Sequence, residues 1–473
     1  MSETMTAHVA VIGAGPGGYA AAFMAADLGM EVALIDVEPS PGGTCLLRGC
    51  IPSKALLHVA KTIHETREAA AWGVRFGEPK LNLKLLRENT QSIVRQLTDG
   101  LGKLVATRKV KYIQGRASLL DAHTLAVFHE DGSEDRLQAE YVIIAAGSRP
   151  AIFGPLIDSP RIMNSTTALL MPDIPKNLLV IGGGYIGLEL GFVYATLGSR
   201  VTVVEVTDGL LPGVDRDLVK PLAKHIEGHF EDIFLNTRVT EMKLQKDGIR
   251  VSMEGPEIKK PTRVFEKVLV AVGRKPNASG LGLKSTRIEV DERGFIQVDA
   301  QRRTAEPNVF AIGDVVGGAM LAHKASCEGR IAAEVIAGRH AAFEPQAIPA
   351  VVFTDPEIAW CGLTETEAQK AGRKVTVSRF PWAASGRAAT LRRTDGLTKI
   401  LCDPHTRQVL GVGIVGHGAG ELIAEGVLAI EMGALADDLD MTIHPHPTLS
   451  ETIMESAGAM FGHSTHFHRP QRT

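Results

Sequence analysis

The stretch HVAVIGAGPGGYAAAFMAADLGMEVALID, residues 8–36, decides the fold of this chain. An apolar strand runs into Gly13, Gly15 and Gly18, an alanine-rich helix follows, and a second strand ends at Asp36. The glycines permit a tight turn and close approach of a pyrophosphate, the helix N-terminus faces the phosphates, and the acid accepts from a ribose hydroxyl. With every element at its proper offset, the stretch predicts a dinucleotide-binding unit rather than a simple glycine-rich turn.

The same unit recurs in the middle of the chain. The strand NLLVIG leads into Gly182, Gly184 and Gly187, and a strand RVTVVE ends on Glu205, the same offset that separates Gly18 from Asp36. The chain therefore holds two copies of one design.

Each copy continues in the same way after its acid. An Asp-Gly turn comes first, Asp131-Gly132 in one copy and Asp247-Gly248 in the other, flanked by alternating residues that predict hairpins. An apolar strand then runs into glycine, at Gly147 and at Gly273. The first copy is longer, and its surplus holds a pair of cysteines and a helical stretch near residues 82–107.

Two cysteines and a lysine lie in the run GGTCLLRGCIPSK, residues 42–54. In a regular helix, positions five apart such as Cys45 and Cys50 have Cα atoms roughly 8–9 Å apart, whereas a disulfide needs less than about 7 Å. A bridge therefore requires a distorted turn, which suits a working redox pair better than a structural staple. Lys54, one turn after Cys50, puts a cation near its sulfur. The alternative is two unpaired core cysteines.

A dithiol combined with two dinucleotide units indicates an electron relay. Thiols exchange an electron pair covalently, nicotinamide accepts hydride, and a flavin converts one process into the other. We therefore expect FAD in the copy that carries the cysteines and the nicotinamide in the second copy. Glu205 favours a free 2′-hydroxyl, and Val206 and Thr207 follow it where an Arg would favour a 2′-phosphate. The expected nicotinamide is NAD rather than NADP.

Two further segments carry polar side chains at informative places. VFAIGDV predicts a buried strand ending in Asp314, which faces the ligand crevice unless it caps the next helix. TIHPHPTLSE, residues 442–451, carries His444, His446 and Glu451. A glutamate one turn into a following helix can orient an imidazole as a general base, although a structural hydrogen bond is the alternative.

Composition excludes several classes of function. The 473 residues carry a net charge of −3, which gives no electrostatic case for binding nucleic acid or an anionic membrane. The N-terminus has no signal-peptide pattern, and no stretch is apolar enough for a membrane span. Beyond the pair, Cys327, Cys361 and Cys402 are scattered singly, which indicates a reducing compartment. We expect a cytoplasmic protein.

The motifs together resemble the flavin-dependent pyridine nucleotide–disulfide oxidoreductases over nearly the whole chain. The resemblance rests on GGTCLLRGCIPSK and on MLAHKA (320–325), FPWAASGRA (380–388) and HPHPTLSE (444–451). Within that family the chain is similar to the members that oxidise dihydrolipoamide in 2-oxo acid dehydrogenase and glycine cleavage complexes. The implied activity is oxidation of protein-bound dihydrolipoamide through FAD to NAD.

The resemblance also implies roles for individual residues. Cys45 would exchange with the lipoyl disulfide, and Cys50 would face the flavin. His446, not His444, would be the base, and Glu451 would orient it. Lys54 would lie by the flavin ring and pair with Glu189, and Asp314 would bind the ribityl chain. The remaining implied cofactor contacts are Gly43, Thr44, Gly115, Ala117, Gly147, Ser148, Tyr185, Ile186, Gly187, Gly273, Arg274, Met320, Leu321 and Ala322.

The expected fold class is α/β, with two Rossmann-like dinucleotide-binding domains and a C-terminal α+β dimerisation domain. FAD would be bound by 1–147 and 277–347 and NAD by 148–276, and 348–473 would form the dimerisation domain. The resemblance implies a homodimer in which His446 of one subunit completes the site at Cys45 of the other. The implied partner is a lipoyl-bearing acyltransferase or a glycine cleavage lipoyl protein, with no lipoyl domain fused here.

Some features depart from the family pattern. Leu47 and Arg48 stand between the cysteines, where the guanidinium either favours thiolate or points to solvent. Pro445 stiffens the histidine loop. The C-terminal segment with His463, His466 and His468 is interpreted as a solvated tail rather than a metal site.

Related reductases are the competing hypotheses. Mercuric reductases carry a further cysteine pair near the C-terminus, and this chain has no cysteine after Cys402. Glutathione reductases use NADPH, which Glu205 disfavours. A binding module that keeps FAD only structurally is disfavoured because the redox and acid–base residues are all present.

Overall fold

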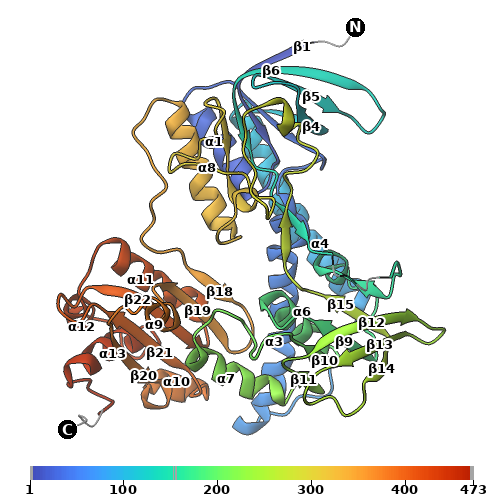
Figure 1. Ribbon diagram of the computed structural model, residues 1–473. Helices are drawn as coiled ribbons and strands as arrows, with labels where there is room; N and C mark the ends of the chain where they lie inside the picture. Colours follow the sequence, from blue (N-terminus) through green and yellow to red (C-terminus); the bar gives the residue numbers. More distant parts are fainter. Residues whose placement is uncertain (1–3, 153, 155–156, 469–473) are drawn as a thin grey trace.

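A computed structural model describes residues 4–152, 154 and 157–468 of the chain (Figure 1). Three sheet-centred units are visible, and a long helix, α3 (Cys50–Glu68), runs from the upper unit to the lower right one. Among the described residues, no helix combines the length and the apolar character that crossing a membrane would require.

The first sheet is built around the stretch that opens the chain. Its order is β3-β2-β1-β6-β5-β4, and β17 pairs with β6. The strands are β1 (Thr4–Ile12), β2 (Val32–Asp36), β3 (Lys111–Gln114), β4 (Arg116–Leu119), β5 (Thr124–Phe128), β6 (Glu134–Ile144) and β17 (Val309–Ala311). The pairs among β1, β2, β3, β6 and β17 are parallel, whereas β4 and β5 are antiparallel additions. The fully buried Val9, Val11 and Leu34 show why these strands are apolar throughout.

Two helices pack together against the first sheet, α1 (Pro16–Asp27) and α8 (Ala322–Ile336). Their backbones approach closely, because a Cβ placed on Gly329 would lie 2.5 Å from the carbonyl oxygen of Gly17. A short 3-10 turn, η3 (Gly313–Val316), lies between β17 and α8 in the chain. The chain therefore returns to its first sheet some three hundred residues after leaving β1, and it brings Asp314 to the end of that sheet.

The surplus of the first unit is helical, as its sequence predicts. It contains α2 (Gly43–Arg48), α3, η1 (Ala69–Trp72) and α4 (Leu83–Thr107). The cysteine segment is not one regular helix, because α2 ends and α3 begins on either side of Gly49. A Cβ on Gly49 would lie 2.8 Å from the carbonyl oxygen of Thr44, so the break needs a glycine.

The second sheet repeats the design of the first, and its order is β11-β10-β9-β15-β8, all parallel. A separate antiparallel sheet β12-β13-β14 lies beside it. The strands are β8 (Ile162–Met163), β9 (Asn177–Ile181), β10 (Arg200–Val204), β11 (Asp232–Phe234), β12 (Arg238–Leu244), β13 (Ile249–Glu254), β14 (Thr262–Phe265) and β15 (Lys267–Val270). The helices are α5 (Ser165–Leu169), α6 (Tyr185–Thr196) and α7 (Arg216–Glu227).

Both predicted hairpins are confirmed. Asp131-Gly132 joins β5 to β6, and Asp247-Gly248 joins β12 to β13. A short antiparallel pair, β7 (Ser148–Pro150) with β16 (Arg274–Pro276), joins the ends of the two nucleotide units.

The C-terminal unit is an antiparallel sheet of order β18-β19-β22-β21-β20 with helices packed on it. Its strands are β18 (Ala350–Val352), β19 (Glu357–Gly362), β20 (Thr376–Pro381), β21 (Leu397–Cys402) and β22 (Val409–Gly416). The helices are α9 (Glu365–Lys370), α10 (Gly386–Leu391), α11 (Ala419–Glu431), α12 (Ala436–Met441) and α13 (Glu451–Phe461), and the remaining 3-10 turns are η2 (Leu283–Ser285) and η4 (Trp382–Ala384). The α/β class with an α+β C-terminal part is confirmed.

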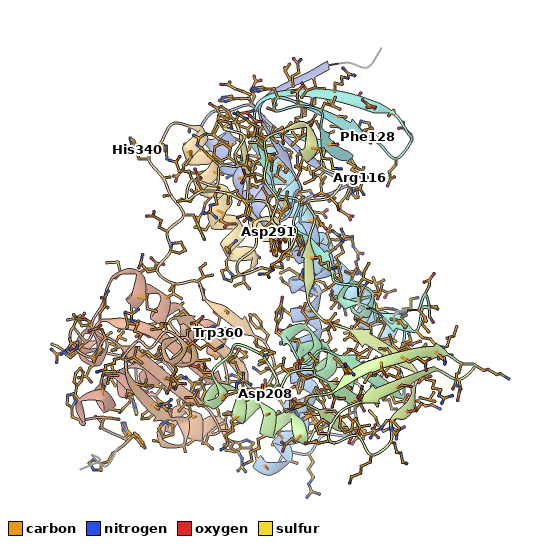
Figure 2. All side chains as sticks on the ribbon, in the orientation of Figure 1. Arg116, Phe128, Asp208, Asp291, His340 and Trp360 are labelled. Carbon is orange, nitrogen blue, oxygen red and sulfur yellow. The ribbon has the colours of Figure 1, made fainter. Side chains whose placement is uncertain are left out.

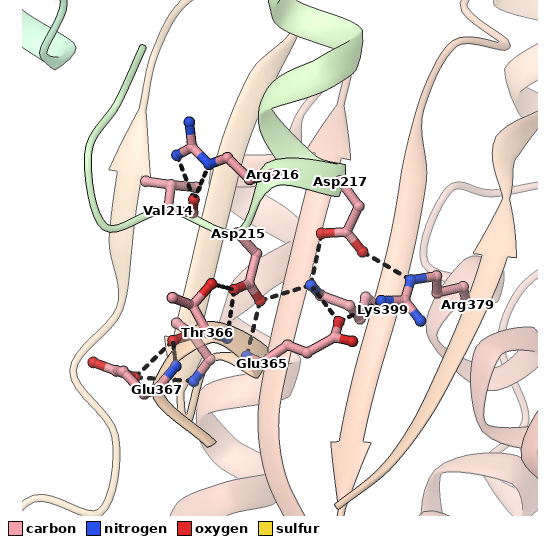
Figure 3. A network of polar contacts seen from close by, with 10 residues as sticks. Val214, Asp215, Arg216, Asp217, Glu365, Thr366, Glu367, Arg379 and Lys399 are labelled. Atoms are coloured by element: carbon pink, nitrogen blue, oxygen red, sulfur yellow. Dashed lines mark hydrogen bonds and ion pairs between the residues drawn. The ribbon is translucent and has the colours of Figure 1, made fainter. Parts of the chain in front are cut away.

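A buried lysine joins the C-terminal unit to the second nucleotide unit (Figure 3). Lys399 on β21 places its Nζ 2.6 Å from Asp215 and 2.7 Å from Asp217 at the start of α7, and 3.4 Å from Glu365 on α9. Arg379 on β20 adds ion pairs to Asp217 and Glu365. Hydrogen bonds from Lys399 and from the α9 N-terminus outweigh burial and hold the pKa of Asp215 low, at about 2.

Candidate active site

The two predicted redox cysteines meet across the break at Gly49. Cys45 lies on α2 and Cys50 is the first residue of α3, and both line one cavity. A hydrogen bond between the two side chains raises the pKa of Cys45 and lowers the pKa of Cys50 to about 7. Burial opposes the fall at Cys50, and the nearby Lys54 ammonium supports it. The pair is therefore electronically unequal, with the negative charge favoured on Cys50.

Lys54 is held in place by a residue from the other nucleotide unit. Its Nζ lies 2.7 Å from Oε2 of Glu189 on α6 and 4.5 Å from the centre of the Phe353 ring. The backbone N–H of Phe353 donates to Oε1 of Glu189 at 3.0 Å. Glu189 is almost fully buried, so this ion pair fixes the cation beside the cavity.

The first cavity collects most of the predicted cofactor contacts. The predicted residues that line it are Gly13, Gly15, Asp36, Gly43, Thr44, Cys45, Cys50, Lys54, Gly147, Ser148, Tyr185, Ile186, Glu189, Arg274, Asp314, Met320 and Ala322. They come from both fingerprints, the cysteine segment and the segment that returns to the first sheet, so only the folded chain brings them together.

Backbone geometry makes this cavity fit a dinucleotide. Gly15 begins α1 without a side-chain cap, so the first N–H groups of the helix are free to bind a pyrophosphate. Gly43 has a φ of 58°, and a Cβ on it would lie 2.5 Å from the Cα of Gly15. A larger residue at position 43 would clash with the backbone of the first fingerprint.

Asp314 has a defined polar partner in this cavity. The hydroxyl of Ser148 donates to Oδ2 of Asp314 at 2.5 Å, and Nε of Arg274 donates to the same hydroxyl at 2.7 Å. The alternative role, as the cap of a following helix, does not hold, because Asp314 lies inside the short turn η3 rather than at its N-cap. The carboxylate can accept hydrogen bonds from ribityl hydroxyls.

The two fingerprint acids hold the glycine loops as well as lining the cavities. Asp36 accepts from the backbone N–H of Ala14 at 2.5 Å and of Glu38 at 2.9 Å. Burial raises its pKa, against the lowering effect of these two bonds. Glu205 accepts from the N–H of Gly183 at 2.6 Å through one oxygen and from the N–H and hydroxyl of Thr207, both at 2.8 Å, through the other.

A second cavity adjoins the first, since Tyr185, Ile186, Arg274 and Met320 line both. Its other predicted residues are Gly182, Gly184, Glu205, Gly273 and Leu321. Like Gly15, Gly184 begins its helix without a side-chain cap, which suits the pyrophosphate of the second dinucleotide.

A tryptophan and an arginine are among the side chains of the second cavity that sequence reasoning missed. Trp360 reaches it from β19 of the C-terminal unit (Figure 2). Arg238 reaches it from β12, and its guanidinium pairs with Glu254 at 2.7 Å. No motif marks either residue, because each enters the cavity only through the packing of a neighbouring sheet.

Four predicted contacts lie outside the linings of both cavities. A Cβ on Gly18 would lie 1.7 Å from the carbonyl oxygen of Gly13, and one on Gly187 would lie 2.1 Å from that of Gly182. These two glycines therefore serve helix–strand packing. Gly115 donates its N–H to the carbonyl of Asp36 at 2.8 Å, and Ala117 is buried in β4.

The two predicted histidines of the C-terminal loop lie in different environments. His444 is 5% exposed, and its nitrogens lie 2.7 Å from Oε1 of Glu425 and 2.9 Å from the carbonyl of Thr442. The side chain of His446 is 70% exposed, and its Nδ1 lies 2.9 Å from Oε1 of Glu451. The other oxygen of Glu451 accepts from the N–H of Thr448 at 2.7 Å. Only His446 keeps Nε2 open to solvent, and it lines neither cavity of its own chain.

The structure also shows where the residues that depart from the family pattern lie. Arg48 lines the first cavity and pairs with Glu38, two residues after the first fingerprint acid. In the tail, His466 places Nδ1 2.5 Å from Oε1 of the buried Glu455, and His463 lies 3.8 Å from Asp440. The His466 contact attaches the tail to α13, whereas the side chain of His463 is 61% exposed. Among the described residues, the tail histidines belong to no cluster with metal-ligand spacing.

Comparison with known proteins accounts for nearly the whole chain. Residues 7–329 match the family described as pyridine nucleotide-disulphide oxidoreductase, and residues 348–457 match its dimerisation domain. The chain is 47% identical to a dihydrolipoyl dehydrogenase of Haemophilus influenzae over 98% of this chain and 97% of that protein. It is 44% identical to one of Thermus scotoductus over 98% and 99%. The solved structure of LpdA from Mycobacterium tuberculosis superposes with a TM-score of 0.89 at 28% identity, covering 96% of this chain and 99% of that one.

Proposed function

The chain belongs to the pyridine nucleotide-disulphide oxidoreductases, and we propose that it oxidises protein-bound dihydrolipoyl groups with NAD as the final acceptor. One structural observation carries the proposal. The thiols of Cys45 and Cys50 lie in the first of two adjoining cavities, each of which is built on a dinucleotide fingerprint. A dithiol in that position can exchange electrons with a dinucleotide in the first cavity and, through it, with a dinucleotide in the second.

Its cofactors are FAD and NAD. The first cavity fits FAD, and the second cavity fits NAD. FAD, when bound, supplies the carrier that links two-electron thiol chemistry to hydride transfer. Gly13, Gly15 and the α1 N-terminus would hold its pyrophosphate and Asp314 its ribityl chain. Glu205 would accept from the NAD ribose, since its oxygens have lone pairs beyond those used by the protein. We propose domain boundaries of 1–147 with 277–347, 148–276 and 348–473.

The difference in pKa between the Cys45 and Cys50 thiols indicates their roles. In the oxidised enzyme we propose a Cys45–Cys50 disulfide. A substrate thiolate attacks the sulfur of Cys45, a mixed disulfide forms, and Cys50 leaves as thiolate. Cys50 is the better leaving group, because the Lys54 ammonium lowers its pKa. The second substrate thiol then displaces Cys45, which releases the oxidised lipoyl group and leaves both cysteines reduced.

A base must take the proton of the first substrate thiol, and His446 is the proposed base. Glu451 accepts from its Nδ1–H and so leaves the Nε2 lone pair pointing outward to receive that proton. His444 cannot take this role, since both of its nitrogens are already engaged inside the protein.

We propose a homodimer in which His446 reaches the cysteines of a second copy. His446 lies outside the cavities of its own chain, and the chain carries the family's dimerisation domain. Large apolar side chains are exposed just before it in the chain, with Ile443 at 95% and Met441 at 81%. Such side chains need a covering surface. The lipoyl group would be presented by an acyltransferase or by a glycine cleavage lipoyl protein.

Complementation between two inactive variants tests both the function and the arrangement. Cys45→Ser and His446→Gln are each expected to lack dihydrolipoamide:NAD activity. When the two chains are co-expressed, half of the dimers are mixed, and each mixed dimer has one intact site made from both chains. About a quarter of the wild-type activity should therefore return.

Three results, from this experiment and from two measurements on the wild-type enzyme, would contradict the proposal in different ways. No recovery in proven mixed dimers would show that both residues act within one chain. A fully active monomer in sedimentation would reject the dimer. An FAD-loaded wild-type enzyme that is inactive with dihydrolipoamide, but active with another disulfide, would reject the substrate.

A further inference from the structure

Three histidines meet where α3 passes the end of α7, and none of them lines either cavity. His64 lies on α3 and is buried, His225 lies on α7, and His229 follows just after that helix. The ring centres of His64 and His229 are 4.8 Å apart, and those of His225 and His229 are 4.6 Å apart. One nitrogen from each ring lies within 4.8 Å of the other two.

The protonation of His229 follows from its neighbours. Its Nδ1 lies 2.9 Å from the carbonyl oxygen of His225, which can only accept, so the proton sits on Nδ1. A neutral ring then carries its lone pair on Nε2. That atom lies 3.2 Å from Nδ1 of His64.

His64 cannot satisfy both of its nitrogens while the pair is neutral. Its Nε2 lies 3.2 Å from Oε1 of Glu68, at ion-pair distance although outside hydrogen-bond geometry. A proton on Nε2 leaves a lone pair on Nδ1 facing that of His229. A proton on Nδ1 leaves a lone pair facing the carboxylate. Both contacts of His64 are favourable at the same time only when a positive charge is added, as a proton or as a metal ion.

His225 indicates whether the added charge is a proton or a metal ion. Nε2 of His225 is buried and has no hydrogen-bond partner among the described residues. No group in the described part of the chain uses this nitrogen, and one nitrogen of His225 belongs to the three-histidine cluster. One added proton would give a partner only to the facing nitrogens of His64 and His229. A cation coordinated between the rings would bind a nitrogen of all three histidines.

We propose that His64, His225 and His229 form a binding site for a divalent transition-metal cation of the Zn²⁺ type. Two nitrogens bound to one tetrahedral Zn²⁺ are about 3.3 Å apart, close to the observed 3.2 Å between His229 and His64. Side-chain rotation of His225 completes the set. Imidazole ligands suit Zn²⁺, Ni²⁺ and Cu²⁺. The carbonyl of His225 and the carboxylate of Glu68 lie behind the ligands, where they orient the rings.

The second cluster with ligand spacing does not compete for a metal ion. Asp215, Asp217 and Glu365 also bring three ligand atoms together, but the ammonium of Lys399 lies among them (Figure 3). At the histidine cluster the bound ion would tie α3, the helix that begins at Cys50, to α7 of the second nucleotide unit.

Zn²⁺ titration of the untagged, FAD-loaded enzyme tests the site. The enzyme is used in its oxidised form, so that Cys45 and Cys50 are not free to bind metal, after a chelator has been added and removed. Calorimetry should show one Zn²⁺ per chain, and the melting temperature should rise with added Zn²⁺. His225→Gln with His229→Gln should weaken binding at least about 100-fold and abolish the thermal shift, and His229→Gln alone at least about tenfold.

Matched controls separate this site from other histidines. His58→Gln, on the exposed face of α3, and His468→Gln, in the tail, should leave the affinity unchanged. Flavin absorbance and dihydrolipoamide activity without metal confirm that each variant is folded. The proposal is overturned if wild type binds none of Zn²⁺, Ni²⁺ and Co²⁺. It is equally overturned if the single and double cluster variants bind Zn²⁺ as tightly as wild type.

Discussion

Lys54 and Glu189 join the cysteine-bearing helix α3 to the second fingerprint helix α6 through an ion pair of 2.7 Å. The two residues are more than a hundred positions apart in the chain, yet both act on the charge of Cys50. They act on it in opposite directions, because the ammonium lowers the pKa of Cys50 and the carboxylate raises it. The ion pair therefore modulates the pKa of Cys50, behind the larger effects of the Cys45 hydrogen bond and of burial, as well as joining two units.

Replacing the members of this pair should shift the Cys50 thiol in opposite directions. Lys54→Met is expected to raise its pKa, and Glu189→Gln to lower it, each by about one unit. The measurement is the pH dependence of alkylation at Cys50, with the modified site read by mass spectrometry. A Cys45→Ser background removes the competing thiol and keeps a hydroxyl that can donate to Cys50. A shift in the same direction in both variants would show that the pair acts only through structure.

The two histidines of the C-terminal loop should differ sharply in their effect on turnover. His446→Gln is expected to reduce kcat with dihydrolipoamide by 10²–10⁴-fold, the typical contribution of a general base. His444→Gln is the matched control, with a loss within about tenfold and a lower melting temperature, because it breaks the contact with Glu425. Steady-state kinetics and thermal melts decide the matter. Comparable losses of turnover in both variants would contradict the assignment of the base.

Glu205 should control the choice between the two nicotinamides. Its carboxylate would lie against a 2′-phosphate, so wild type is expected to prefer NAD over NADP by at least about tenfold to 100-fold in kcat/KM. Glu205→Gln removes the charge and keeps an oxygen that can accept from Gly183, so most of that preference should disappear. Arg238→Ala, in the same cavity, tests whether the guanidinium contributes to either nucleotide. Equal use of NAD and NADP by wild type would show that the acid has been misinterpreted.

The buried Lys399 should be a major contributor to the stability of the unit junction. Lys399→Met leaves three carboxylates without their central cation and is expected to cost about 3–5 kcal/mol of unfolding free energy. Lys243→Met, which removes an exposed pair with Glu241, should cost less than about 1 kcal/mol. Urea titrations of the two variants in parallel give the comparison. A loss at Lys399 no larger than at Lys243 would contradict this role.

The same junction should weaken in acid. The pKa of Asp215 is about 2 in the folded protein and lies below its unfolded value, so its contribution is complete above the unfolded pKa and is lost as the pH falls toward 2. Stability measured between pH 5 and pH 2 should fall in wild type. It should fall less in Asp215→Asn, where this carboxyl is missing.

Much of the fold could be predicted because its signals are local. Each fingerprint contains its strand, glycines, helix and acid within about thirty residues, and period-two alternation around an Asp-Gly turn is enough to mark a hairpin. The cysteine segment was predicted to be distorted from spacing alone, and the break at Gly49 provides that distortion. Most site residues inside these motifs line the cavities, from Gly13 to Glu205.

The sequence by itself thus determined the two nucleotide units, the redox pair and the identity of the acids, because short-range sterics and spacing dictate them. Only the tertiary structure decided which side chains meet across units. It brought Glu189 to Lys54, Arg238 to the second cavity and His64 to His225, and it placed His446 outside the cavities of its own chain. Gly18 and Gly187 were predicted as cofactor contacts, but they line neither cavity and hold a helix against its strand. Such encounters depend on the packing of apolar faces between distant segments, a non-local property that leaves no spacing pattern in the chain.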